Sequence, residues 1–171
     1  MSFTDLILKL QKLTRDETRG LILEDHKRIL SFSVSTFQAL VSRLVAVAGN
    51  RVAQLIMYEL GDEMGWTLAQ HRKKKTTSNN FLDAFDDALR MRGWGRCVSL
   101  EEKQPNVFVS THSDCPLCYR RKAAEPFCDL MRGVAAGWME GLLNKKATRA
   151  VEIKCSAVDG KFCVFEVSFN D

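Results

Sequence analysis

The chain has 171 residues, of which 46% are hydrophobic and 27% charged, and its formal net charge is +4. This composition is typical of a globular protein and excludes a disordered or fibrous chain. A chain of this length fits one domain, which buries about 70% of the surface that its unfolded form exposes. The mild positive charge gives no argument for a polyanionic partner.

The amino terminus lacks the basic start, apolar stretch and small-residue cleavage site of a signal peptide. No apolar run approaches the ~20 residues that span a bilayer. We therefore expect a cytoplasmic protein with no membrane span. Thiols stay reduced in the cytoplasm, so clustered cysteines there more often serve metals or redox chemistry than disulfides.

The amino-terminal part predicts a helix followed by a hairpin. Apolar residues at helical spacing predict a short amphipathic helix over residues 4–13. We assign residues 1–20 to this helical segment, which packs either on its own domain or on a second subunit. Two apolar runs, residues 21–23 and 29–32, predict a hairpin or a strand that leads to a turn. Residues 21–171 are then expected to form a single domain.

Two longer helices are predicted next, over residues 35–48 and 52–70, with Ser35 as the cap and Gly49 as the end of the first. A basic run, residues 71–75, follows the second helix, where cations oppose the helix dipole favourably. The run has no interleaved aromatic residues and belongs to no recognisable nucleic-acid-binding module. Nucleic acid is therefore not an expected partner.

A third helix is predicted to begin at Phe81 and to end at Gly93-Trp94-Gly95. Residues 98–100 and 107–109 follow as two strands around a polar turn. We expect these strands to share one antiparallel sheet with a hairpin at the carboxyl terminus.

Glycines recur on one side of a helix that follows Cys128. Gly133, Gly137 and Gly141 are spaced by four residues and so form one stripe. Each glycine costs the helix about 1 kcal/mol relative to alanine. Another backbone or a ligand is therefore expected to come very close to this stripe.

The carboxyl-terminal hairpin is predicted to bring two cysteines together. A three-residue loop with Gly160 in the left-handed conformation would place Cys155 opposite Cys163, with Cβ atoms about 5 Å apart. Two ligands of one metal fit that separation better than a relaxed disulfide, which prefers about 3.8 Å. Glu152 would face the other side of a straight strand, so we predict a bulge or strand end near Cys155.

Together with Cys128, these residues form a candidate tetrahedral zinc site: Cys128, Glu152, Cys155 and Cys163. Four protein ligands leave no open position for water, which indicates a structural site. The alternative from spacing alone is a set of ordinary buried thiols. Cys115-Pro-Leu-Cys118 has the spacing of a redox dithiol or of half a second zinc site that shares Cys155 and Cys163. A free pair is the third alternative.

Cys128 with Gly133 and Gly137, followed by Glu152, Cys155 and Cys163, resembles the vinyl-4-reductase (4VR) domain family. The resemblance extends upstream through Gly61, Gly65 and the Gly93-Trp94-Gly95 turn and covers most of residues 30–168. The family includes the sensory domains of phenol-responsive transcription activators and is distantly similar in fold to the TRAPP vesicle-tethering components. This chain departs from the family pattern in two ways. The interval from Cys128 to Glu152 is one residue longer than in the phenol sensors, and the pair Cys115 and Cys118 is additional.

The resemblance implies an α+β fold of TRAPP/NO-sensor-like type, in which an antiparallel sheet packs against a helical layer and a carboxyl-terminal hairpin binds zinc through the four residues above. It also implies an apolar pocket for a small hydrophobic or aromatic ligand. Trp138 matches a pocket-lining position, with Trp94 and Met91 as further candidates, and core packing of Trp138 is the alternative.

No catalytic constellation and no nucleotide-binding fingerprint are found, so we expect a non-enzymatic protein. The phenol sensors carry further domains, whereas this chain ends at Asp171, and we expect a separate effector protein to receive any signal. A homodimer is expected from the resemblance and from the apolar amino-terminal segment. The alternative function is a non-catalytic dimeric scaffold of the TRAPP-component type. A redox enzyme that acts through Cys115 and Cys118 is a third hypothesis.

Overall fold

The computed structural model describes residues 13–16, 21–24, 27–29, 32–73 and 81–170. The chain divides into two compact units, residues 1–37 and 38–171, whereas the predicted boundary followed residue 20. The predicted helix over residues 4–13 lies outside the described residues, except for Leu13.

The first unit contains a small antiparallel sheet of strands β1 (Leu13–Asp16), β2 (Leu21–Glu24) and β3 (Lys27–Ile29), in the order β1-β2-β3. The pairing of Ile22 with Ile29 confirms the predicted hairpin. Strand β1 falls within the segment that was assigned to a helix. Its backbone groups pair with β2, and this pairing overrides the local helical pattern from Leu13 onward.

The second unit contains a four-stranded antiparallel sheet in the order β4-β5-β7-β6. Its strands are β4 (Arg96–Gln104), β5 (Val107–Ser113), β6 (Ala147–Lys154) and β7 (Cys163–Phe169). The prediction that the two central strands and the carboxyl-terminal hairpin share one antiparallel sheet is confirmed.

The helices are α2 (Val34–Ala48), α3 (Asn50–Lys73), α4 (Phe81–Arg90), α5 (Asp129–Leu143) and the single turn α6 (Ser156–Asp159). Ser33 caps α2, because its Oγ accepts a hydrogen bond of 3.1 Å from the amide of Thr36. The prediction of Ser35 as the cap is therefore wrong. Gly49 ends the helix as predicted, with φ at 79°.

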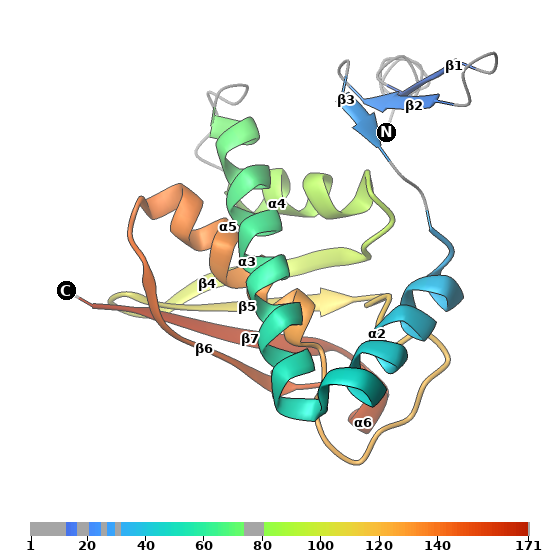
Figure 1. Cartoon of the computed structure of the whole chain (residues 1–171). Coiled ribbons are helices and arrows are strands. Elements are labelled where there is room, and N and C mark those ends of the chain that lie inside the picture. Colours follow the sequence, from blue (N-terminus) through green and yellow to red (C-terminus); the bar gives the residue numbers. More distant parts are fainter. Residues whose placement is uncertain (1–12, 17–20, 25–26, 30–31, 74–80, 171) are drawn as a thin grey trace. The chain divides into compact units, whose positions relative to one another are not determined.

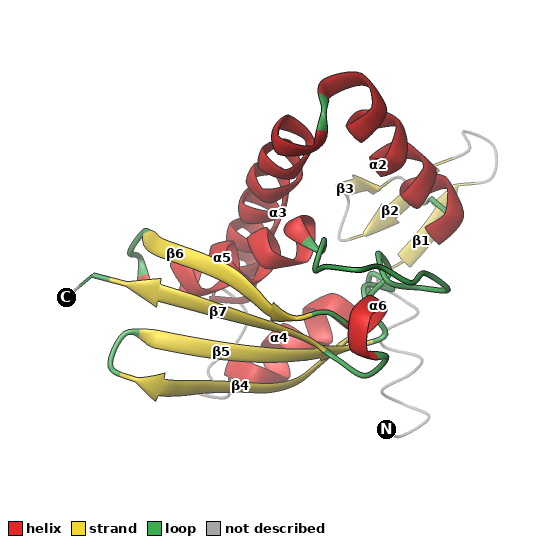
Figure 2. Cartoon of the chain, turned by 90° about the horizontal axis from the view of Figure 1, so that it is seen from below, coloured by secondary structure: helices red, strands yellow, loops and turns green. Residues whose placement is uncertain are grey.

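Helices cover one face of the four-stranded sheet (Figures 1 and 2). Helix α4 contacts β4, and α5 contacts β6 and β7, while α3 packs on α5. The core between sheet and helices includes Phe85, His112, Trp138 and Phe165, all buried. Among the described residues no helix is both long and apolar enough to cross a membrane.

Four glycines allow α3 and α5 to touch through their backbones, and we call Gly61, Gly65, Gly133 and Gly137 the glycine interface. A Cβ atom on Gly61 would overlap the carbonyl oxygen of Leu130 on α5, and one on Gly137 would overlap the carbonyl oxygen of Asp62 on α3. The expected close approach is therefore that of another backbone. The spacing of the glycines reflects helix packing.

The carboxyl-terminal hairpin has the predicted irregularity. The register between β6 and β7 shifts between Glu152 and Lys154, which confirms the predicted bulge. The connection is the helical turn α6 and not a three-residue loop, although Gly160 is left-handed with φ at 81°. Lys154 pairs with Val164, so Cys155 follows the last pair of β6 and Cys163 precedes it on β7.

Candidate metal centre and ligand pocket

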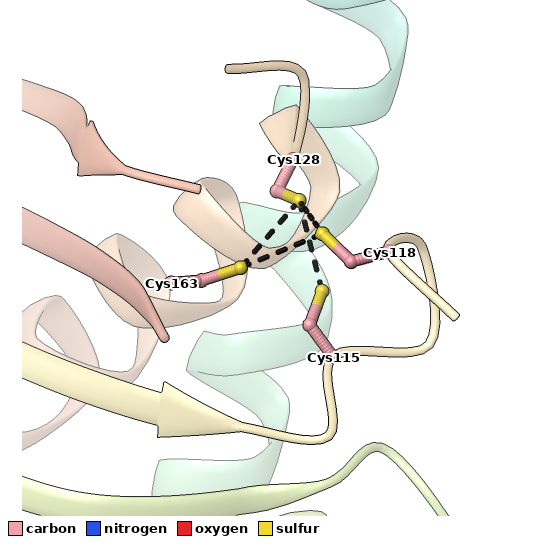
Figure 3. A group of neighbouring side chains, drawn as sticks. All are labelled: Cys115, Cys118, Cys128 and Cys163. Carbon is pink, nitrogen blue, oxygen red and sulfur yellow. Dashed lines mark hydrogen bonds between the residues drawn. The ribbon is translucent and has the colours of Figure 1, made fainter. Parts of the chain in front are cut away.

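Five cysteines converge where the sheet meets the start of α5, and we call Cys115, Cys118, Cys128, Cys155 and Cys163 the cysteine cluster. Two come from the loop after β5, one precedes α5, one follows β6 and one begins β7. All five are buried and none forms a disulfide. Figure 3 shows four of them pointing toward one another.

The sulfurs stand at the separations of ligands on one metal. The Sγ of Cys128 lies 3.8 Å from that of Cys155 and 3.9 Å from that of Cys163. Two four-residue sets have all their ligand atoms within 4.8 Å of one another. One is the predicted set with Glu152, and the other joins Cys115 and Cys118 to Cys128 and Cys163.

Glu152 approaches the cluster from β6. Its Oε2 accepts a hydrogen bond of 2.7 Å from the backbone amide of Cys128, at the start of α5. Its Oε1 is buried with no hydrogen-bond partner among the described residues. Burial raises the pKa of Glu152 to about 8, although the bond from the Cys128 amide opposes that shift.

The thiols of the cluster hold their protons unequally. Contacts with neighbouring thiols, first that of Cys115, lower the pKa of Cys118. Contact with the Cys128 side chain lowers the pKa of Cys155, whereas contact with Cys115 raises the pKa of Cys128. A metal ion would displace such protons, because the thiolate and not the thiol is the metal ligand.

Two donors face the sulfur of Cys163. The backbone amide and the hydroxyl of Ser156 each lie 3.4 Å from this Sγ, and both can donate to a thiolate. Sulfur-rich sites with tetrahedral spacing suit zinc or an iron–sulfur centre. The residues of the cluster therefore fit a metal ion.

The loop with Cys115 and Cys118 is held by a side chain from α2. Gln38 Nε2 donates to the carbonyl oxygens of Pro116, Leu117 and Tyr119 over 3.0–3.2 Å. Sequence reasoning treated Cys118 as one of several alternatives, and the two-residue spacing to Cys115 was the signal that could have placed it in the cluster. The sixth cysteine, Cys97, lies apart, and burial raises its pKa to about 12.

Trp138 lies in an aromatic group in the core. Its ring stacks on Phe85 with centroids 4.7 Å apart, and His112 meets the same phenylalanine edge-on at 5.5 Å. Trp138 Nε1 and His112 Nδ1 are both buried with no hydrogen-bond partner among the described residues. Two unsatisfied polar atoms beside one aromatic ring are unusual, because each costs about 1–3 kcal/mol.

The other two predicted pocket residues lie near the end of α4. Met91 is half-buried, and its sulfur accepts a contact of 3.6 Å from Arg72. Trp94 is half-buried, and its amide donates to the carbonyl oxygen of Leu89 over 3.1 Å.

A cavity of about 290 Å³ lies elsewhere, beside the cysteine cluster. Its apolar wall includes side chains from α2, α3, the loop before α5 and α5 itself: Val41, Val45, Met57, Leu117, Phe127 and Leu130. Trp138, Trp94 and Met91 do not line this cavity. Leu117 and Phe127 immediately precede Cys118 and Cys128, so the cavity and the cluster share a wall.

Residues 108–169 match the family model of the vinyl-4-reductase (4VR) domain, which confirms the resemblance to that family for this segment. In sequence the chain is 30% identical over 121 residues to an uncharacterised protein of Methanocaldococcus jannaschii, MJ0855. That match covers 68% of this chain but 46% of the relative, so the chain spans about half of that protein's length.

Two solved structures have a similar fold. The phenol-responsive sensory domain of the transcription activator PoxR, determined with phenol, matches with a TM-score of 0.78 at 18% identity, over 99% of this chain and 92% of that one. A trafficking protein particle complex subunit 3 from Naegleria fowleri, covalently bound to palmitic acid, matches with a TM-score of 0.61 at 15% identity, over 81% and 93%. These likenesses confirm the predicted α+β fold.

Proposed function

We propose that this chain is a non-enzymatic sensor-type domain that binds a small hydrophobic or aromatic molecule and holds a structural zinc ion. The observation that carries the ligand proposal is the largely apolar cavity beside the cysteine cluster. Its volume is near the lower end of the range for small-molecule pockets, roughly 300–1,000 Å³. The structures of the PoxR domain with phenol and of the trafficking subunit with palmitic acid support the same class of ligand.

Trp138 is the proposed alternative location for an aromatic ligand, with Trp94 and Met91 at its margin. A ligand hydroxyl that reached both Trp138 Nε1 and His112 Nδ1 would satisfy two buried polar atoms. Phe85 stacks on Trp138, so this binding mode requires Phe85 to move.

Calorimetry with phenol as the probe tests the proposal and separates the two locations. Ala53 is buried and lines the cavity, so Ala53→Leu partly fills that space and should weaken binding at least tenfold if the cavity is the site. Trp138→Phe removes only the N–H donor and ring area, and should weaken binding instead if the aromatic group is the site. Absence of saturable binding of phenol and of palmitic acid by the wild-type chain would overturn the proposal.

The zinc ion is proposed to rest on Cys128, Cys155 and Cys163, with Glu152 as the fourth ligand that the family resemblance implies. The cytoplasm, where thiols stay reduced, is the proposed location. When bound, zinc supplies folding energy and no open coordination position. Native mass spectrometry of the purified chain should find one zinc per chain in a homodimer, and a metal-free chain would contradict the metal assignment.

The exposed apolar side chains of α2 and α3 favour a second candidate function, a dimeric scaffold with a separate effector protein as partner. These residues are Leu40, Val47, Val52, Leu55, Ile56 and Leu60. Contiguous apolar surface of this kind is typical of protein contacts. A dimer that binds neither probe ligand would favour the scaffold over the sensor.

A further inference from the structure

The Sγ of Cys118 lies at ligand distance from all three cysteines of the proposed zinc site. It stands 3.2 Å from that of Cys128, 3.5 Å from that of Cys155 and 3.6 Å from that of Cys163. Zinc–sulfur bonds of about 2.3 Å at tetrahedral angles put sulfurs about 3.8 Å apart. The separations of Cys128 from Cys155 and Cys163, 3.8 and 3.9 Å, complete five of the six edges of such a tetrahedron.

We propose that Cys118 supplies the fourth ligand in place of Glu152, so that the metal is bound by Cys118, Cys128, Cys155 and Cys163. This inference rests on the metal in the proposed function and changes the identity of one ligand. An all-sulfur site has no carboxylate oxygen and keeps the structural character of a closed tetrahedral centre.

The loop geometry holds Cys118 in place before any metal binds. The amide of Cys118 donates to the carbonyl oxygen of Cys115 over 3.1 Å, which closes a turn. Leu117 is 1% exposed and anchors that turn in the core. Gln38 holds the carbonyl groups on both sides of Cys118, so the thiol faces the cluster without a further ordering cost.

Glu152 then has a different task. Its Oε2 accepts the bond from the amide of Cys128 and so fixes the backbone of a metal ligand. A carboxylate near the first turn of α5 also favours the positive end of the helix dipole. The unpaired Oε1 is the observation that favours the rival arrangement, with Glu152 as ligand, and the experiment must distinguish the two.

A two-metal centre is the other alternative, because the two four-residue sets share Cys128 and Cys163. In such a centre Cys118 and Cys155 would be terminal ligands of different metals and would stand farther apart than ligands of one metal. Their sulfurs are only 3.5 Å apart. The geometry therefore points to one metal between Cys118 and Cys155, with Cys115 beside the site at 3.7 Å from Cys128 Sγ.

X-ray absorption at the zinc edge of the full chain loaded with one equivalent of zinc tests the proposal. We expect four sulfurs at about 2.3 Å in the wild type. Cys118→Ser should lose one sulfur, whereas Glu152→Gln should retain all four. Cys115→Ser is the matched control, since it removes the other thiol of the same loop and should also retain four.

Three sulfurs and one oxygen at about 2.0 Å in the wild type, with the oxygen lost in Glu152→Gln, would overturn the assignment of Cys118 and leave the proposed zinc site standing. A chain that binds no zinc would overturn both. If Cys118→Ser does not fold, the wild-type and Glu152→Gln spectra still decide between the two ligands. Cobalt(II) in place of zinc gives a second measure, because its thiolate charge-transfer absorption falls with each lost sulfur.

Discussion

The glycine interface and the cysteine cluster both position α5, but they depend on opposite properties of the residues that form them. Along the helix, Gly133 and Gly137 serve because they have no side chain, which lets the backbone of α3 come close. At its start, Cys128 serves through the donor atom of its side chain. The interface is therefore expected to be sensitive to added atoms, and the cluster to lost donors.

This difference separates two sources of stability. The glycine interface is packed by the chain alone, through dispersion and excluded water. The cysteine cluster gathers buried thiols that gain their full stabilisation only with a bound metal. Measurements of unfolding with and without metal can therefore assign stability to each region.

The largest effect is expected from the cluster. Cys155→Ser should lower the free energy of unfolding by more than about 4 kcal/mol, because loss of a structural metal ligand removes folding energy. Chemical denaturation with parallel determination of zinc content checks this. Cys97→Ala is the control outside the cluster and should retain its zinc. Unchanged stability and zinc content in Cys155→Ser would contradict the metal assignment.

The next effect concerns His112, which is buried in the core and belongs to neither region. Burial lowers its pKa from 6.5 to about 4. The unfolded chain thus binds a proton at a higher pH than the folded chain does. Stability from this group is complete above pH 6.5 and decreases as the pH falls toward 4, by up to roughly 3 kcal/mol.

Denaturation curves at pH 7 and pH 4.5 for the wild type and for His112→Gln measure this contribution. The variant should lose less stability on acidification than the wild type does. The same loss in both proteins would show that other groups cause the pH dependence.

A smaller effect is expected for one added methyl group at the glycine interface. Alanine in place of Gly137 would gain about 1 kcal/mol in helix propensity. Its Cβ, however, would overlap the carbonyl oxygen of Asp62, and overpacking against a backbone costs more than that gain. We expect a net loss of about 2 kcal/mol in denaturant unfolding.

Gly49→Ala is the control for Gly137→Ala. Gly49 has φ at 79° and no atom near its added Cβ, so the control measures backbone strain without a clash. A stabilised Gly137→Ala would contradict the close packing of α3 on α5.

The smallest effect is expected for Cys115→Ser. If Cys115 only borders the metal, this change should cost less than about 1 kcal/mol and leave the zinc content unchanged. Thermal unfolding and metal analysis check both quantities. Loss of zinc would place Cys115 among the ligands and would favour the set that joins Cys115 and Cys118 to Cys128 and Cys163.

Much of the fold could be predicted because its signals are local. The glycine spacing indicated one face of a helix, and alternating apolar residues indicated the strands of the carboxyl-terminal hairpin. The bulge near Cys155 followed from the demand that Glu152 and Cys155 approach one centre, and the register shift after Glu152 confirms it. The helical cap was misassigned to Ser35, because serines at 33 and 35 carry the same local signal.

By itself, the sequence determined the antiparallel hairpin, the helices and the close-approach face of α5, since each depends on a period of two or about four residues. Only the tertiary structure decided what meets at each face. It brought the loop of Cys118 to cysteines 10, 37 and 45 positions away, and placed a cavity beside that loop. Contacts between distant segments depend on the packing of whole elements, which no local period encodes.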